Sequence, residues 1–264
     1  MKKGFNLLSS RLVEARLTGS LVDTEDNEPI KNANMAYLVQ HKVLQGLGSH
    51  SSFWKVGSTS SEAQKKLGTT EPGACRVPDR FCFSDGDRVP VFDSHDLWVE
   101  GEFGLRLGSD LPPREIAYNR DEVIEAVDGV APSIEIVGCR LVKGISKSGR
   151  FNITADCGAN VALCVGDVNT DLRKIDLPTQ TAELYINRTK LVTGYGERAL
   201  GDPVNVMVWL ANHQRKTEGL KRGQLVSTGT CTGLEKVKPG DIIELRCGSV
   251  GVITVTLEDA PGKP

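Results

Sequence analysis

From about residue 75 onward, the chain is built of short apolar or alternating runs that are separated by glycine and proline. Runs of this kind are typical of β-strands, and their close spacing favours a β-roll or sandwich. Frequent glycines and scarce aromatic residues suit many tight turns between short strands. We therefore predict a mixed, mainly β fold. The predicted strands are Val89–Phe92, Leu97–Leu107, Ser133–Val137, Ala162–Val165, Ala182–Ile186, Leu225–Thr228, Ile242–Leu245 and Val250–Leu257.

The first 72 residues have a different pattern, in which apolar residues recur at helical spacing. Helices are predicted over residues 5–20, 32–44 and 61–67, with glycine at or just after the end of each. Two more helices are expected inside the β-rich part, at residues 120–126 and 203–212. We accordingly predict an N-terminal helical segment, residues 1–72, beside a β-rich catalytic domain, residues 73–264.

The pattern that points most directly to chemistry is Glu100-Gly101-Glu102 within one predicted strand. Residues two apart in a strand point to the same side, so both glutamates project into one space. Glu135 lies between two isoleucines in a second predicted strand. Three carboxylates in an apolar setting repel one another and lose hydration. Mg²⁺ or Mn²⁺ would relieve both costs, because these ions prefer oxygen ligands. A solvated surface strand is the alternative, since this short motif also occurs by chance.

Three further polar residues each have a functional and a structural interpretation. Lys55, in a short apolar strand, would assist proton transfer or bind an anionic substrate, or it would extend its ammonium group to water from an edge strand. Thr230 either helps a glycine-rich turn to hold a carboxylate or belongs to a tight turn alone. Asp156 follows a strand-like run and either faces the same cavity or caps a turn.

Charge and composition argue against several classes of protein. With 32 basic and 34 acidic residues the net charge is -2, which predicts no nucleic-acid partner. The seven cysteines form no C-x-x-C pair and no clear disulfide framework, so a reducing, cytoplasmic setting is expected. We predict no membrane-spanning segment and no signal peptide. All four histidines are predicted at the surface, because none has a metal-ligand partner at the usual spacing.

Together, the ordered motifs resemble those of the fumarylacetoacetate hydrolase superfamily, and within it the 2-keto-4-pentenoate hydratase and 4-oxalocrotonate decarboxylase branch. The resemblance covers nearly the whole chain, and several motifs in order are far more specific than any one of them. The motifs are Ala36-Tyr-Leu-Val-Gln40, Lys55-Val-Gly-Ser-Thr-Ser60, Gln64-Lys-Lys-Leu-Gly68, Val99-Glu-Gly-Glu102, Ile134-Glu-Ile-Val-Gly138, Ala155-Asp156, Leu200-Gly-Asp-Pro203, Val208-Trp-Leu-Ala211, Gly223 and Thr228-Gly-Thr-Cys-Thr-Gly233.

The resemblance implies a fumarylacetoacetase-like β-roll with the N-terminal helices packed beside it, usually in homo-oligomers. It implies that Glu100, Glu102 and Glu135 hold Mg²⁺ or Mn²⁺. It also implies that Lys55 lies near the substrate and that Thr230 helps to hold the substrate carboxylate.

Two positions depart from the family pattern. Hydratases of this branch typically carry an acidic residue after a proline in the segment that here contains Pro72, but Gly73 follows that proline. Glu71 is therefore the candidate for the missing catalytic acid, with Asp79 as the alternative.

The second departure follows Asp156, the third candidate catalytic residue beside Lys55 and Glu71. Where the family has a serine near the substrate, this chain has Ala159, with Asn160 next. Metal binding and enolate stabilisation are expected to survive both departures, so the step in question is the addition of water.

The function implied is a metal-dependent hydratase that adds water to a 2-hydroxy-2,4-dienoate in aromatic catabolism, giving a 4-hydroxy-2-oxo acid. A decarboxylase of a vinylogous 2-oxo diacid is the close alternative, because the metal site and the lysine suit both reactions. A third interpretation is a member that has lost catalysis and serves as a binding or assembly partner. The expected partners are a 2-oxo acid, further copies of the chain and, as an open alternative, another enzyme of the same pathway.

Overall fold

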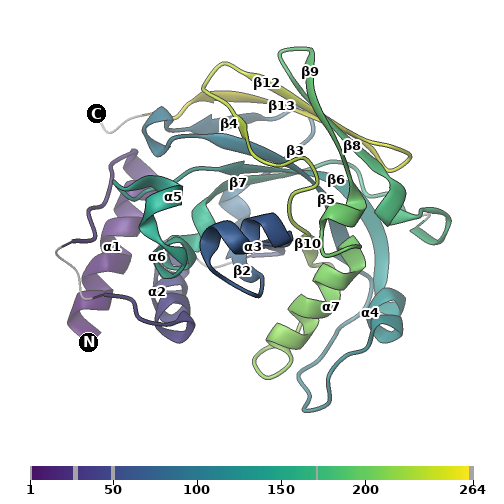
Figure 1. The fold of residues 1–264 in the computed structure, drawn as a ribbon, viewed down its shortest axis with the longest axis horizontal. Helices are drawn as coiled ribbons and strands as arrows, with labels where there is room; N and C mark the ends of the chain where they lie inside the picture. The colour runs from purple at the N-terminus through teal and green to yellow at the C-terminus, as the bar shows by residue number, and fades with distance from the viewer. Residues whose placement is uncertain (1, 26–28, 49–50, 171, 262–264) are drawn as a thin grey trace.

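The computed structural model describes residues 2–25, 29–48, 51–170 and 172–261, and shows two sheets with helices around them (Figure 1). The helices are α1 (Lys2–Thr18), α2 (Ala33–Gly46), α3 (Ser61–Leu67), α4 (Arg120–Ala126), α5 (Gly144–Ser148), α6 (Arg150–Ala155) and α7 (Pro203–Gln214). The strands are β1 (Phe53–Gly57), β2 (Gly73–Val77), β3 (Cys82–Ser84), β4 (Arg88–Val91), β5 (Trp98–Leu107), β6 (Val127–Val137), β7 (Asn160–Val165), β8 (Thr181–Ile186), β9 (Thr189–Tyr195), β10 (Leu225–Ser227), β11 (Glu235–Lys236), β12 (Ile242–Cys247) and β13 (Gly251–Asp259).

The larger sheet is centred on the long antiparallel pair β5 and β6. Its strand order is β2-β1-β10-β5-β6-β7-β3, with β11 also paired to β5, and the smaller sheet has the order β4-β13-β12-β8-β9. Nearly every residue of β6 is buried. A strand buried on both faces is normally apolar throughout, so a charged side chain within this pair is an exception that needs a partner.

The two sheets pack against each other through apolar side chains, and Gly101 lies at the closest approach. A Cβ atom on Gly101 would come within 2.5 Å of Cδ1 of Leu245, which is on β12 in the smaller sheet. Glycine therefore lets the sheets meet on this face of β5. The glutamates on either side of it in the sequence point to the other face.

The N-terminal helices form a second apolar cluster beside the larger sheet, and α1, α2, α5 and α6 lie together on the left of Figure 1. The buried face of α1 is formed by Phe5, Leu8 and Leu12, which follow helical spacing. Leu7 and Leu17 are exposed, so not every leucine of α1 belongs to its buried face.

Most of the elements predicted from the sequence are confirmed, with boundaries within a few residues. Local signals explain this: Ser60 caps the N-terminus of α3, and Gly68 ends it with a φ of 63°. A capping box between Asn119 and Glu122 begins α4. The mixed, mainly β architecture with an N-terminal helical part is as predicted.

Some elements were not predicted. The sequence analysis identified neither β9, whose residues are mostly exposed, nor the short β2 and β3. The strand-like run assigned before Asp156 is wrong, because residues 150–155 form α6. Ile153 and Ala155 pack against the helical cluster, and this tertiary contact favours helix where apolar content alone is ambiguous.

The proposed division of the chain at residue 72 stays a prediction. The segment before it is not wholly helical, because β1 pairs with β10 and with β2 in the larger sheet. The boundary between residues 72 and 73 thus falls between two neighbouring strands of one sheet.

Candidate metal centre

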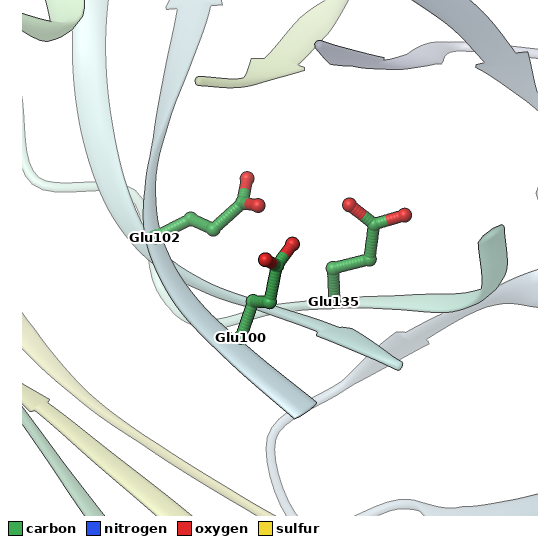
Figure 2. Close-up of side chains that lie close together, drawn as sticks. All are labelled: Glu100, Glu102 and Glu135. Atoms are coloured by element: carbon green, nitrogen blue, oxygen red, sulfur yellow. The ribbon is translucent and has the colours of Figure 1, made fainter. Parts of the chain in front are cut away.

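Strand pairing brings the three candidate glutamates together. In the β5–β6 ladder Glu100 lies directly opposite Glu135, and Glu102 lies opposite Ser133. Ligand atoms of Glu100, Glu102 and Glu135 all lie within 4.8 Å of one another. Figure 2 shows the three carboxyl groups converging from the two strands. Like charges opposite each other destabilise a sheet, so this arrangement requires a compensating positive charge.

Glu102 is held by groups from the end of β10 and from the loop that follows it. The hydroxyl of Ser227 and the backbone N–H of Gly229, at 2.9 Å, both donate to Oε2 of Glu102. Gly229 has a φ of +89°, and a Cβ atom there would lie 1.9 Å from the Thr59 hydroxyl oxygen, so this N–H is presented by a position that requires glycine. The other carboxyl oxygen, Oε1 of Glu102, is buried and has no hydrogen-bond partner in the part of the chain that the structure describes.

Glu135 is paired within the protein. The ammonium nitrogen of Lys55 lies 3.2 Å from Oε1 of Glu135, and Nδ2 of Asn160 donates to the same oxygen at 3.0 Å. Lys55 also donates to the carbonyl oxygen of Gly158 at 2.7 Å. Lys55 is buried, so its ammonium group is directed into the site and not to water.

The pKa values reflect three carboxyl groups in one place, of which Glu102 and Glu135 are buried and Glu100 is half-buried. Burial, followed by the nearby Glu135 carboxylate, raises the pKa of Glu100 to about 8. Burial and the two neighbouring carboxylates also raise the pKa of Glu102 well above its usual value. Burial by itself lowers the pKa of Lys55, but Glu135, together with Cys75 and Glu100, outweighs it and the net shift is upward, so the ammonium group stays charged at neutral pH.

These residues fit a divalent cation. The donors are all carboxylate oxygens, the set that Mg²⁺ and Mn²⁺ prefer. The unpartnered Oε1 of Glu102 is a buried acceptor directed at the cluster, and an ion there would satisfy it. One lysine neutralises only one of the three carboxylates, so a second positive charge is still needed.

A cavity of about 140 Å³ opens beside the centre and gives a substrate access to it. Lys55 and Glu100 line it together with apolar side chains from α3 and α6. Its remaining lining residues include Gly73, Ala159 and Arg150. Both positions that depart from the family pattern therefore lie in the wall of this cavity.

Three other predicted site residues are placed differently from the glutamates and Lys55. Asp156 is buried and binds Arg140: Nε of Arg140 donates to Oδ1 at 2.7 Å, and the backbone N–H of Arg140 donates to Oδ2 at 3.1 Å. Glu71 is exposed. Thr230 closes its own turn, accepting from the backbone N–H of Gly233 at 2.7 Å. None of the three is among the cavity-lining residues, so their proposed roles stay predictions.

The residues that orient the glutamates were not predicted from the sequence. Asn160 reaches Glu135 because Arg16 of α1 holds its side-chain oxygen at 3.0 Å and its backbone oxygen at 2.7 Å. Ser227, which holds Glu102, is buried in β10. A polar residue within an apolar strand was the available signal for Ser227. No sequence pattern links Arg16 to a residue so distant along the chain.

The prediction for the histidines is partly wrong. His41 and His213 are exposed, but His95 is buried, and burial lowers its pKa to about 4. His50 lies outside the described residues. In the part of the chain that the structure describes, no helix is both long and apolar enough to cross a bilayer.

Comparison with known families agrees with this geometry. Residues 46–258 match the model of the fumarylacetoacetate (FAA) hydrolase C-terminal family. The chain belongs to this family. A 2-keto-4-pentenoate hydratase from Paraburkholderia xenovorans (strain LB400) is 31% identical over 252 residues, covering 94% of this chain and 92% of the relative.

Solved structures of the family share the fold. The structure of 4-oxalocrotonate decarboxylase from Pseudomonas putida G7, complexed with magnesium and adipate, superposes with a TM-score of 0.88 at 23% identity, covering 97% of this chain and 98% of that chain. The same enzyme complexed with calcium and acetate gives a TM-score of 0.86 with the same coverage and identity. The family resemblance inferred from the sequence motifs is thus confirmed.

Proposed function

We propose that this protein is a divalent-metal-dependent hydratase that adds water to a 2-hydroxy-2,4-dienoate and forms a 4-hydroxy-2-oxo acid. The observation that carries the proposal is the convergence of Glu100, Glu102 and Glu135 beside Lys55, at the wall of a small cavity. The hydratase relative at 31% identity over nearly the whole chain supports it. We further propose Mg²⁺ or Mn²⁺ as the resident ion, a homo-oligomeric assembly and a cytoplasmic location.

When bound, the ion would supply positive charge for the carboxylate and the keto or enolate oxygen of a 2-oxo acid. The three glutamates would hold it and leave positions open for the substrate. Ketonisation moves the proton of the 2-hydroxyl group to C5, and water then adds its oxygen at C4 and a proton at C3. The product is a 4-hydroxy-2-oxo acid, and no atom is lost.

Lys55 is the cavity-lining group best placed to take part in these proton movements. Because Glu135 keeps its ammonium group charged, Lys55 acts as a hydrogen-bond donor or proton donor and not as a base. Thr230, in the turn after Gly229, is proposed to help hold the substrate carboxylate. For Asp156 we propose a supporting part: it anchors Arg140, whose Nη1 donates to the carbonyl oxygen of Asn160 at 2.8 Å.

A decarboxylase is the second candidate, favoured by one observation. Apart from Glu100, no carboxylate among the described residues lines the cavity, because Gly73 carries no side chain and Glu71 is exposed. A hydratase needs a group that activates water, whereas in decarboxylation CO₂ departs and its bonding electrons pass to the same enolate oxygen. The likeness to the decarboxylase structure concerns the fold and does not decide between the two reactions.

The test is turnover by the purified protein with Mg²⁺ or Mn²⁺. A hydratase removes the ultraviolet absorbance of a 2-hydroxy-2,4-dienoate without releasing CO₂, whereas a decarboxylase releases CO₂ from a 2-oxo diacid. If several such acids bind and none reacts, both enzyme proposals fail, and a binding or assembly role remains.

A further inference from the structure

The cavity beside the metal centre contains a second cation, Arg150, at the first residue of α6. Its side chain is half-buried, and its two terminal nitrogens donate to the carbonyl oxygens of Glu71, at 3.0 Å, and Pro72, at 3.1 Å. Among the described residues Arg150 forms no ion pair. A guanidinium group has five N–H donors, so these two contacts orient it and leave donors free.

The space next to this guanidinium group is open. Gly73 follows the two residues whose carbonyl groups Arg150 binds, and it also lines the cavity. A Cβ atom on Gly73 would meet only the hydroxyl oxygen of Tyr37, at 3.8 Å. The protein thus places a partly desolvated positive charge in the cavity wall and supplies no carboxylate for it. Such a charge is most favourable when a ligand brings the counter-charge.

Helix α6 connects Arg150 to the segment that contacts Lys55 at the metal centre. Arg150 begins this helix, whereas Lys55 binds the carbonyl oxygen of Gly158, just beyond its end. A helix of six residues is about 9 Å long at about 1.5 Å per residue. Both cations line one cavity. A single molecule with an acid group at each end would therefore meet a positive charge at each end.

We propose that Arg150 binds a second carboxylate at the far end of the substrate. The substrate class is then a 2-oxo or 2-hydroxydienoic diacid and not a monoacid. This inference rests on the proposed function, because the first acid group is placed at the glutamate centre. The carboxylate would accept charge-assisted hydrogen bonds from the guanidinium donors that the backbone carbonyls leave free.

The test compares 2-oxoadipate with 2-oxohexanoate, which share a six-carbon chain and differ only in the terminal carboxylate. Calorimetric titration of the Mg²⁺-loaded protein is expected to show 2-oxoadipate binding about tenfold or more tightly. Arg150→Gln should abolish this preference while leaving 2-oxohexanoate affinity nearly unchanged. Gly73→Asp should also reduce the preference, because it places a carboxylate beside Arg150 without removing the contacts to the loop. Lys147→Gln, which removes an exposed lysine outside the cavity, is the matched control and should keep the preference.

Equal affinity of the two acids for the wild-type protein would overturn the inference. It would also be overturned if Arg150→Gln, with its fold verified by thermal melting, weakened both acids by the same factor, since Arg150 would then only clamp the loop. Failure of the proposed function looks different: in that case neither 2-oxo acid binds more tightly when Mg²⁺ is added.

Discussion

Two buried acidic regions of this protein lie close together in the fold and are neutralised in opposite ways. Asp156 has both carboxyl oxygens bonded to Arg140, which itself is buried and makes further bonds to the carbonyl oxygens of Asp156 and Asn160. Among the described residues Glu100 and Glu102 form no such ion pair, and Oε1 of Glu102 accepts no hydrogen bond from them. The charge of a buried acid with its own counter-ion is compensated within the protein, whereas acids without one are available to an external cation.

The largest effect on stability is expected at the ion pair between Arg140 and Asp156. Arg140→Met would leave Asp156 buried and unpaired, which costs about 3–5 kcal/mol of unfolding free energy. Chemical denaturation measures this. The double variant Arg140→Met with Asp156→Asn should recover part of the loss. If the single variant is as stable as the wild type, the ion pair has no structural role.

At the glutamate centre the effect should be on metal binding and not on stability. Glu102→Gln removes a charged ligand, so affinity for Mg²⁺ or Mn²⁺ should fall by more than the roughly 10–100-fold that losing an outer hydrogen-bond partner costs. Titration calorimetry and activity at limiting metal measure this loss. The metal-free variant should be at least as stable as the wild type, because a repelling charge is removed. Unchanged activity at limiting metal would refute the ligand assignment.

Lys55 connects the metal centre to the cavity and should separate binding from turnover. Lys55→Ala is expected to lower kcat by about a hundredfold, while metal affinity changes much less. Steady-state kinetics at saturating metal measure kcat, and a metal titration measures the metal affinity. A fully active Lys55→Ala protein would remove this residue from the mechanism.

The raised pKa of Glu100 also predicts that stability depends on pH. The pKa of Glu100 is about 8 in the folded protein, against an ordinary value of 4.5. Between pH 4.5 and pH 8 the Glu100 carboxyl group therefore keeps its proton in the folded protein but has lost it in the unfolded chain. The metal-free protein should therefore lose stability as pH rises from about 4.5 to about 8, which thermal melting measures as a falling melting temperature. Added Mg²⁺ should stabilise more at pH 8 than at pH 5.

The control for this pH dependence is Glu100→Gln, which cannot titrate. Its melting temperature should change less over the same pH range in the absence of metal. If the two proteins show the same profile, the raised pKa of Glu100 does not contribute to folding.

How much of the fold and of the site could be predicted from the sequence depends on how far apart in the chain the interacting residues lie. Local signals worked well: the glycine that ends α3 and the spacing of Glu100 and Glu102 in β5 both act within a few residues. Asp156 shows the limit. Its neighbours resembled a strand, but residues 150–155 form a helix, and its partner Arg140 lies 16 positions away along the chain.

The sequence by itself determined the alternation of short strands, the N-terminal helices, the family and the identity of three glutamates that share one chemistry. The register of β5 against β6 was decided only in the tertiary structure, because pairing depends on which faces the whole sheet buries. That register places Glu135 opposite Glu100. The contact of Arg16 with Asn160 and the presence of Arg150 in the same cavity as Lys55 likewise arise from packing between distant segments, which no local pattern encodes.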